Sequence, residues 1–419
     1  MSVFNEEEFG EGLVTELELF NLPGVQTSVN EIYYEEIRPL SAISGDGPYE
    51  FRVNGQHSSD YLDLRNSQLY VRLKVQKADG SDLTAEHVGP ANLFLQSLFS
   101  ASEVSLQNKA SITNNYNPYR AYIQTLLTYG QDALSSQIQT QGWYIDDSDS
   151  PGVSDPAGTN NGLYERSKWI GKSMTLDLQG PIFHDLFSMD RYLLNQVDVK
   201  LKLYRSPVTF ALLAKDASTN FKINIEDIYV LARKIRVNPA VLYGHSKILE
   251  KRNALYPYTK VECRSQSVAT GSASFQWDNL FQGQKPEKVI VGFVKSKALN
   301  GDYTTNPFNF ENCGINHIAL YADGLPVGGN PLKLDFAQAD GTAVMRAYTN
   351  LLMSSGKWRQ DEGNALDIKH FLSGSTLFAF QLEPDFSHHG EFLALVKNGN
   401  VRLEVQFSSG LTGKLYNRI

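Results

Sequence analysis

The chain has 419 residues, of which 42% are hydrophobic and 11% aromatic, and its formal net charge is −8. This length is too great for one ordinary hydrophobic core and predicts two domains of about 200 residues each. Sequence-independent nucleic-acid binding needs clustered lysine and arginine, so the charge balance argues against that class of protein. No run of about 18 apolar residues occurs, so no membrane-spanning helix is predicted.

Cysteine usage predicts a reducing compartment. Cys263 and Cys313 are the only two cysteines of the chain, and we expect both to be free thiols. The first residues contain no apolar segment of the kind that directs secretion. We therefore expect the protein to be synthesised inside the cell.

The first 30 residues are predicted to form an acidic amino-terminal arm. Residues 1–37 hold nine glutamates and no lysine or arginine, whereas the remaining residues carry 37 acids and 38 bases. Such an arm is unsuited to contact DNA, whose phosphates would repel it. It suits docking on a basic protein surface, or simple solvation.

Alternation of apolar and polar residues predicts β-strands throughout the rest of the chain. A period of two, typical of half-buried strands, occurs in residues 69–76, 197–204 and 401–407. Residues 289–294 are apolar without interruption and predict a more buried strand.

Only a few helices are expected. Asn117 as cap, Pro118 in the first turn and Gly130 after the last turn predict a short helix. Gly356 is expected to end a matching helix in the second half. A third helix, from Asn238-Pro239 to about Asn253, is predicted to connect the two halves.

One long stretch has no regular pattern. Residues 142–163 are dense in Gly, Pro, Asp, Ser and Asn. A loop of this length is usually functional or mobile, and its polar composition predicts a solvent-exposed loop on the outer face of the first domain.

Two pairs of similar segments indicate an internal duplication. Arg120-Ala121-Tyr122 recurs as Arg346-Ala347-Tyr348, 226 residues later, and residues 199–203 resemble residues 401–405. Repetition at a domain-sized period favours two similar domains in tandem. We interpret the repeated triplet as structural: arginine reaches a carboxylate or a backbone oxygen, while tyrosine fixes the helix against a sheet.

These patterns predict an all-β protein made of two tandem eight-stranded jelly rolls with a few short helices. An immunoglobulin-like sandwich has a similar composition, but the length of each half favours the jelly roll. The predicted divisions are the arm (1–30), a first roll (31–237), a connecting helix (238–254) and a second roll (255–419).

Metal-binding patterns are weak. His388-His389-x-Glu391 is the densest His/Glu cluster, but adjacent residues of a strand point to opposite faces. Asp146, Asp147 and Asp149 could bind Ca²⁺, yet the spacing lacks the usual calcium loop. We predict no metal and no cofactor.

Catalytic patterns are equally weak. Cys263 or Cys313 could pair with His317 or His370, although free cysteines are usually buried small apolar groups. Gly10-x-Gly12 has no strand–helix context, and paired carboxylates such as Glu35-Glu36 are common. The sequence therefore predicts a protein that is not an enzyme and that functions through its surfaces.

Several segments, in this order and spacing, resemble the double jelly-roll major capsid proteins of Polinton (Maverick) elements and adintoviruses, and more distantly those of virophages and adenovirus hexons. The resemblance covers roughly residues 15–415. The segments are Thr15-Glu16-Leu17-Glu18-Leu19-Phe20, Gln26-Thr27-Ser28, Tyr61-Leu62-Asp63-Leu64, Phe94-Leu95-Gln96-Ser97-Leu98-Phe99, Tyr119-Arg120-Ala121-Tyr122, Asp190-Arg191-Tyr192-Leu193-Leu194-Asn195, Asn306-Pro307-Phe308-Asn309-Phe310 and Ala322-Asp323-Gly324.

The resemblance implies a structural role. Members of this family form homotrimers with a pseudo-hexameric outline, which tile an icosahedral shell around double-stranded DNA. A separate single jelly-roll protein fills the five-fold vertices, and the amino-terminal arm tends to lie beneath the trimer. The expected location is the virion capsid, assembled inside the host cell. The alternatives are a glycan-acting enzyme or a carbohydrate- or protein-binding module on a double β-sandwich.

Overall fold

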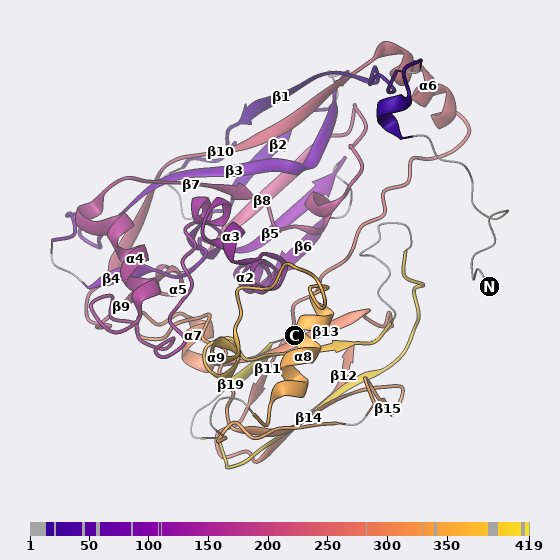
Figure 1. Cartoon of the computed structure of the whole chain (residues 1–419). Helices are drawn as coiled ribbons and strands as arrows, with labels where there is room; N and C mark the ends of the chain where they lie inside the picture. Colours follow the sequence, from indigo (N-terminus) through magenta and orange to yellow (C-terminus); the bar gives the residue numbers. More distant parts are fainter. Residues whose placement is uncertain are drawn as a thin grey trace, which may run out of the picture.

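The structure, a computed structural model, describes residues 14–20, 22–43, 47–55, 59–84, 87–107, 109, 111–281, 283–329, 331–338, 342–383, 393–411 and 415–418. Figure 1 shows two β-structured bodies, the amino-terminal one above and the carboxy-terminal one below. Each consists of two antiparallel sheets in the strand order of a jelly roll. The predicted fold class, two tandem jelly rolls with a few short helices, is confirmed.

The first roll pairs the sheet β1-β10-β3-β7 with the sheet β2-β8-β5-β6. Its strands are β1 (Val29–Ile37), β2 (Tyr49–Val53), β3 (Tyr61–Lys77), β5 (Phe99–Leu106), β6 (Ile112–Asn115), β7 (Leu176–Pro181), β8 (Val199–Arg205) and β10 (Phe221–Val237), with the short pair β4 (Val88–Pro90) and β9 (Leu212–Ala214) beside them. The apolar residues of β3 at 69, 71, 73 and 75 are buried and alternate with more exposed neighbours, as the period of two predicts.

The second roll repeats this order, with the sheet β11-β19-β13-β17 and the sheet β12-β18-β14-β15, in which β16 also pairs with β14. Its strands are β11 (Ser265–Val268), β12 (Ser274–Phe281), β13 (Lys288–Lys295), β14 (Ile315–Ala322), β15 (Leu325–Pro326), β16 (Leu332–Lys333), β17 (Leu377–Gln381), β18 (Val401–Phe407) and β19 (Leu415–Arg418). Residues 289–294 lie in β13, at the centre of their sheet, which explains their continuous apolar character.

Short helices connect the strands. They are η2 (Thr15–Leu17), α1 (Phe94–Ser97), α2 (Asn117–Thr128), α3 (Gln131–Leu134), η3 (Gln137–Gln141), α4 (Asn161–Ile170), η4 (Gly171–Ser173), η5 (Asp185–Ser188), α5 (Val208–Ala211), α6 (Pro239–Leu249), α7 (Ser296–Asn300), α8 (Met345–Ser354) and α9 (Ile368–Leu372). No helix within the described ranges is long and apolar enough to cross a membrane.

The three predicted helices are present, with shifted ends. Asn117 is the first residue of α2 instead of its cap, because Tyr116 takes up the left-handed backbone conformation that turns the chain into the helix. The helix α6 begins where predicted, and Asn238 caps it by accepting a hydrogen bond from the N–H of Ala240 at 3.0 Å. This helix ends at Leu249, earlier than expected, and none of its residues is buried.

The two rolls place their repeated segments at the same points of the topology. The helix α2 connects the fifth and sixth strands of the first roll, β6 and β7, and α8 connects β16 and β17, the corresponding strands of the second. Residues 199–203 lie in β8 and residues 401–405 in β18, and each strand is the second of its sheet, β2-β8-β5-β6 and β12-β18-β14-β15. The pairing order of the sheets is thus the same in both halves.

Candidate functional site at the junction of the rolls

The junction between the two rolls is built on α2, which lies between the two bodies in Figure 1. Its aromatic residues Tyr119 and Tyr122 face Phe308 and Phe310 of the second roll. The rings of Tyr122 and Phe308 stack at 4.3 Å with an interplanar angle of 7°, and Tyr119 meets Phe308 edge-on at 5.7 Å. All four residues belong to one buried apolar cluster that extends into both halves. The rolls therefore share a hydrophobic core at this point.

A buried polar group lies beside these rings. The guanidinium of Arg166, fully buried in α4, donates to the Asp146 carboxylate at 2.7 Å and to the Pro90 carbonyl oxygen at 2.9 Å. The other carboxylate oxygen of Asp146 accepts from the side-chain amide of Asn306 at 2.9 Å, and the same amide donates to the Pro151 carbonyl oxygen at 2.8 Å. A charge pair from the first roll is thus bonded directly to the second roll.

The prediction for residues 142–163 is therefore wrong in part. Trp143, Asp146 and Asn160 are buried, and Asn160 donates to Asp146 at 3.0 Å. Asp146 bonds to Asn160 of this segment and to Asn306, and these bonds offset the cost of burying its carboxylate. Its last residues begin α4. The segment forms part of the junction, and only some of its residues, such as Asp149 and Gly158, are exposed.

The repeated triplets lie in different surroundings. Arg120 is buried and pairs with Asp185 at 2.6 Å, and burial lowers the pKa of this arginine. Arg346 is exposed, and among the described residues its guanidinium donates one long hydrogen bond, of 3.5 Å, to the Gly328 carbonyl oxygen.

The other two positions of the triplets resemble each other more closely. Ala121 and Ala347 are both buried. Tyr122 is buried in the junction, where burial raises the pKa of its hydroxyl, and Tyr348 is half-buried and donates to the Leu366 carbonyl oxygen at 2.7 Å. The alanine and tyrosine positions thus face the protein interior in both helices.

The candidate reactive residues do not form a reactive site in the described part of the chain. Burial raises the pKa of the Cys313 thiol to about 12, so the nucleophilic thiolate is disfavoured at neutral pH. His370 bonds to the carboxylate of Asp367 at 2.8 Å. Cys263 is a half-buried free thiol, and His317 lies in β14.

The candidate metal ligands are separated in the same way. Asp146 is held by Arg166, and Asp147 accepts from the backbone N–H of Asp149 at 3.1 Å. Among the described residues, no group of three or more His, Cys, Asp or Glu side chains could hold a metal ion. Glu35 forms an ion pair with Lys234 on the neighbouring strand. The residues 388–391 and 10–12, singled out in the sequence, lie outside the described residues.

A buried histidine is expected to make the stability of the first roll depend on pH. His184 lies just before η5, with Nε2 3.0 Å from the Ile112 carbonyl oxygen and Nδ1 accepting from the Leu186 N–H at 3.2 Å. Burial lowers the pKa of His184 below its usual value. Because the folded state binds this proton more weakly than the unfolded state, the contribution to stability is full above about pH 6.5 and is lost progressively below it.

The variant His184→Asn is expected to remove this part of the pH dependence. Asparagine can still cap η5 by accepting from the Leu186 N–H, but it does not titrate. The denaturation midpoint of the wild-type protein should fall more than that of the variant between about pH 7.5 and about pH 5.5. The midpoints are measured by denaturant unfolding at each pH. If they fall equally with pH in the wild type and in His184→Asn, the pH dependence does not come from His184.

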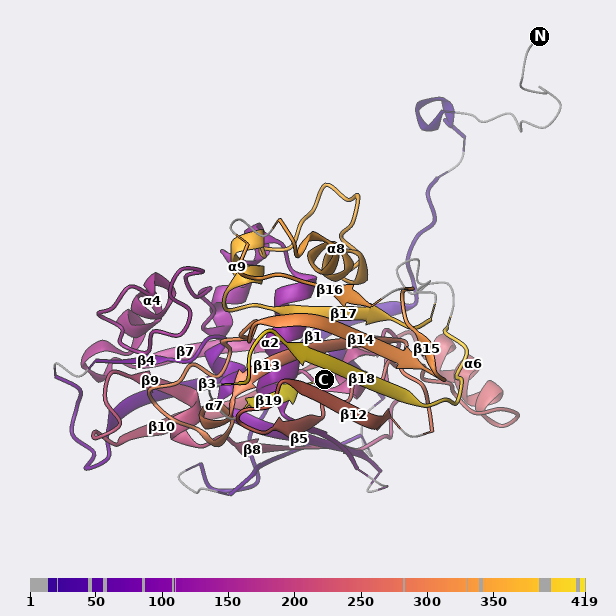
Figure 2. The same cartoon turned by 90° about the horizontal axis from the view of Figure 1, so that it is seen from below.

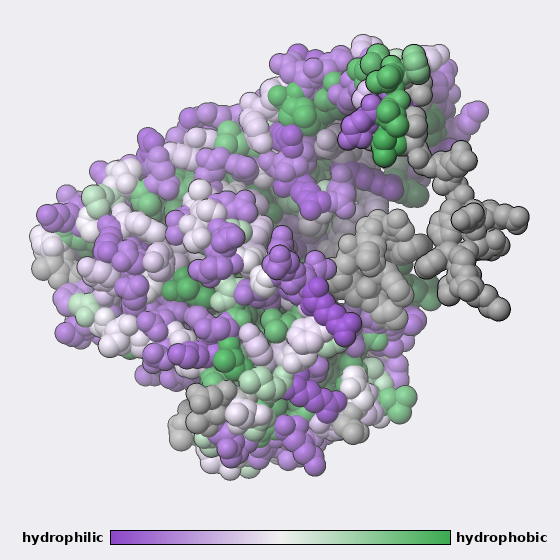
Figure 3. Space-filling view, in the orientation of Figure 1, coloured by the Kyte–Doolittle hydropathy of each residue, from purple (hydrophilic) through white to green (hydrophobic). Residues whose placement is uncertain are grey.

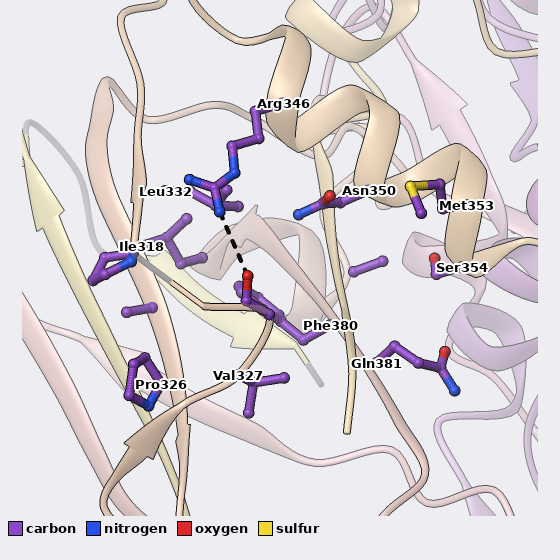
Figure 4. A pocket seen from close by; sticks show the side chains of 14 residues that line it. Ile318, Pro326, Val327, Leu332, Arg346, Asn350, Met353, Ser354, Phe380 and Gln381 are labelled. Carbon is purple, nitrogen blue, oxygen red and sulfur yellow. Dashed lines mark hydrogen bonds between the residues drawn. The ribbon is translucent and has the colours of Figure 1, made fainter. Parts of the chain in front are cut away.

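Beside α8, on the second roll, lies a pocket of about 420 Å³ (Figure 4). Its wall is mostly apolar, and Arg346 and Asn350 of α8 lie along one edge. The lining residues include Ile318, Pro326, Val327, Leu332, Met353 and Phe380. Figure 2 shows α8 and α9 standing out on one side of the second roll.

Further apolar residues are exposed in the described part of the arm. Leu17, Leu19 and Leu22 are exposed, and Phe20 is 95% exposed. Figure 2 shows this segment extending away from the body of the molecule, and Figure 3 shows apolar surface where the arm and α6 project. Isolated exposed apolar residues are ordinary, but a succession of them on an extended segment marks an interaction surface.

Sequence reasoning missed the polar group of Asp146, Arg166 and Asn306. Asn306 and Phe308 were noticed, because they begin the segment Asn306-Pro307-Phe308-Asn309-Phe310 on which the resemblance partly rests. The partner of Asn306 lies 160 residues earlier in the chain. No local pattern relates the two.

Comparisons with known proteins agree on the fold. No protein-family model matches the chain. It is 26% identical over 399 residues to the uncharacterized protein F54H12.2 of Caenorhabditis elegans, covering 92% of each chain.

Solved viral structures match along nearly the whole chain. A chain of the Sputnik virophage structure aligns with 98% of this chain and 89% of its own length, at 13% identity and a TM-score of 0.58. A chain of the PBCV-1 virus capsid covers 95% of each chain at 10% identity and a TM-score of 0.57. The Faustovirus major capsid protein covers 96% of this chain and 92% of its own, at 10% identity and a TM-score of 0.55. The chain therefore has the double jelly-roll fold of these viral structures.

Proposed function

We propose that the protein is a structural major capsid protein. Three copies would form a capsomer with a pseudo-hexameric outline, and capsomers would tile an icosahedral shell around double-stranded DNA. The observation that carries this proposal is the end-to-end match of both rolls to viral chains, including a major capsid protein, at TM-scores of 0.55 to 0.58. In such a role the chain acts through its surfaces and not through a reactive centre.

The lineage is proposed to be that of the Polinton elements and adintoviruses. Support comes from the sequence segments that resemble this family, among them Asp190-Arg191-Tyr192 and Asn306-Pro307-Phe308. The similarity to a nematode protein over 92% of both chains accords with a lineage that also occurs in animal genomes. The implied location is the virion capsid, after synthesis and assembly inside the host cell.

The two rolls are proposed to have arisen by duplication and to be separated by residues 238–254. The repeated triplets on α2 and α8, and the repeated strands β8 and β18, support this division. The helix α6, none of whose residues is fully buried, lies between the sheets of the two rolls in sequence, which agrees with a connecting role.

The proposed partners are further copies of the same chain and a single jelly-roll protein at the five-fold vertices. The exposed leucines of the arm and Phe20, alternating in part with Glu16 and Glu18, suit a partner surface that is apolar and basic. The arm would dock there, beneath the trimer, and not on the packaged DNA.

The purified chain is expected to be a homotrimer and to assemble into particles. Obligate assemblies of this kind bury more than about 2,000 Å² per interface, so the trimer should persist at micromolar concentration. Sedimentation velocity gives the mass of the species, to be compared with three times 46.8 kDa, and electron microscopy shows whether shells form. A stable monomer at micromolar concentration would contradict the proposal.

A further inference from the structure

The corresponding helices α2 and α8 differ in how far they are covered. Both connect the fifth and sixth strands of their roll. Nine of the twelve residues of α2 are buried, whereas only three of the ten residues of α8 are. The difference lies on the side facing away from the parent roll, because α2 has the second roll packed against that side.

Corresponding residues show the difference directly. When Arg120 is aligned with Arg346, Tyr119 corresponds to Met345 and Leu127 to Met353. Tyr119 and Leu127 are 2% and 7% exposed, and both belong to the cluster that contains Phe308 of the second roll. Met345 and Met353 are 45% and 54% exposed. The helix of the second roll therefore presents apolar side chains at the positions where α2 is covered by a neighbouring roll.

We propose that the exposed face of α8, together with the pocket beside it, is covered by the first roll of a second copy of this chain. This inference rests on the proposed function. In a closed ring of alternating first and second rolls, each roll meets the next through the same side. Within one chain the second roll covers α2 of the first roll, and between chains the first roll of the next copy covers α8.

The chemistry of this face suits burial against protein. The apolar part of the pocket wall includes Pro326, Val327 and Phe380, and the flexible side chain of Met353 can adapt to a partner. When an apolar side chain of a partner enters the pocket, apolar surface is removed from water, and this lowers the free energy of the complex.

The charge on this face indicates what the partner must supply. Arg346 at the pocket edge makes one long hydrogen bond, of 3.5 Å, and a guanidinium has five N–H groups to donate. Its counterpart Arg120 is paired with Asp185, a carboxylate of its own roll. Among the described residues no carboxylate pairs with Arg346, so the next copy is expected to place a carboxylate or a carbonyl oxygen against it.

The first test introduces charge into this face. The double variant Met345→Glu, Met353→Glu is expected to weaken trimer formation by about a hundredfold or more, because carboxylates at the centre of an interface lose their water. The variant should fold as a monomer, since both side chains are exposed in the single chain, and circular dichroism and thermal unfolding check this. Ile248→Glu places one glutamate at an exposed position of α6, a helix far from α8 in Figure 1, and should leave the trimer intact.

The second test needs no variant. Purified wild-type trimer is treated with hydrogen peroxide in the presence of a short methionine peptide, and oxidation of each methionine is followed by mass spectrometry. Met345 and Met353 should react as slowly as the buried Met189. The oxidation rates also show whether the α8 face is covered in the trimer if the double variant fails to fold, or if the Ile248→Glu trimer dissociates as well.

The outcomes separate the inference from the proposed function. A wild-type chain that remains monomeric contradicts the capsid proposal itself. A trimer in which Met345 and Met353 oxidise as fast as the free peptide, or one that survives the double substitution, contradicts only the assignment of the α8 face.

Discussion

Replacing Phe308 with alanine is expected to lower the free energy of unfolding by about 3 to 5 kcal/mol, the range for truncating a buried aromatic residue. The ring of Phe308 stacks on Tyr122 at 4.3 Å and also contacts Tyr119 and Phe210 edge-on, at 5.7 and 6.1 Å. It therefore joins the second roll to α2 of the first. Its loss leaves a cavity at the centre of the junction, where the surrounding rings belong to two different rolls.

Tryptophan fluorescence can report whether the junction between the two rolls is intact. Trp143 is buried and its ring lies 5.3 Å from that of Tyr122, so its emission should report the opening of the junction. The signal is isolated by comparison with Trp143→Phe. In Phe308→Ala the change in Trp143 emission should occur at lower denaturant concentration than in the wild type.

An exposed phenylalanine supplies the control. Phe20 is 95% exposed on the arm. The variant Phe20→Ala should therefore change the free energy of unfolding by no more than about 0.5 kcal/mol. If Phe308→Ala also costs less than about 1 kcal/mol, the aromatic stack is not what joins the rolls.

The variant Asp146→Asn is expected to cost about 3 to 5 kcal/mol, because it leaves the charge of the buried Arg166 without its partner. The side chains of Arg166 and Asp146 are 0% and 7% exposed and lie 2.7 Å apart. Asparagine keeps the size of the side chain, but its NH2 group replaces one of the two oxygens that accept from Arg166, Asn160 and Asn306. The variant therefore loses one hydrogen-bond acceptor as well as the charge. Denaturant unfolding, with circular dichroism as the signal, measures the loss.

A surface pair of the same chemistry supplies the matched control. Arg72 and Asp177 are bonded at 2.8 Å, with side chains 46% and 49% exposed. The variant Asp177→Asn should cost no more than about 1 kcal/mol, since water and salt screen exposed charges. Equal effects of the two substitutions would show that the burial of the Asp146 pair has no energetic consequence.

The sequence by itself determined the elements of each roll. The alternation at residues 69–76, 197–204 and 401–407 was enough to predict β3, β8 and β18, because a strand with one buried face needs a period of two and this requirement is local. Asn238-Pro239 predicted the start of α6 for a similar reason, since capping involves only neighbouring residues. Together with the length of each half, the many short strands favoured two jelly rolls over immunoglobulin-like sandwiches.

The tertiary structure alone decided which polar residues are buried and which apolar ones remain uncovered. Residues 142–163 have the composition of an exposed loop, yet Asp146 is buried because Arg166 and Asn306 satisfy its carboxylate. The triplets at Arg120 and Arg346 are identical, yet one arginine is buried and the other exposed. Burial depends on which surface is packed against a residue, and here that surface comes from the other roll, at a separation that no local pattern encodes.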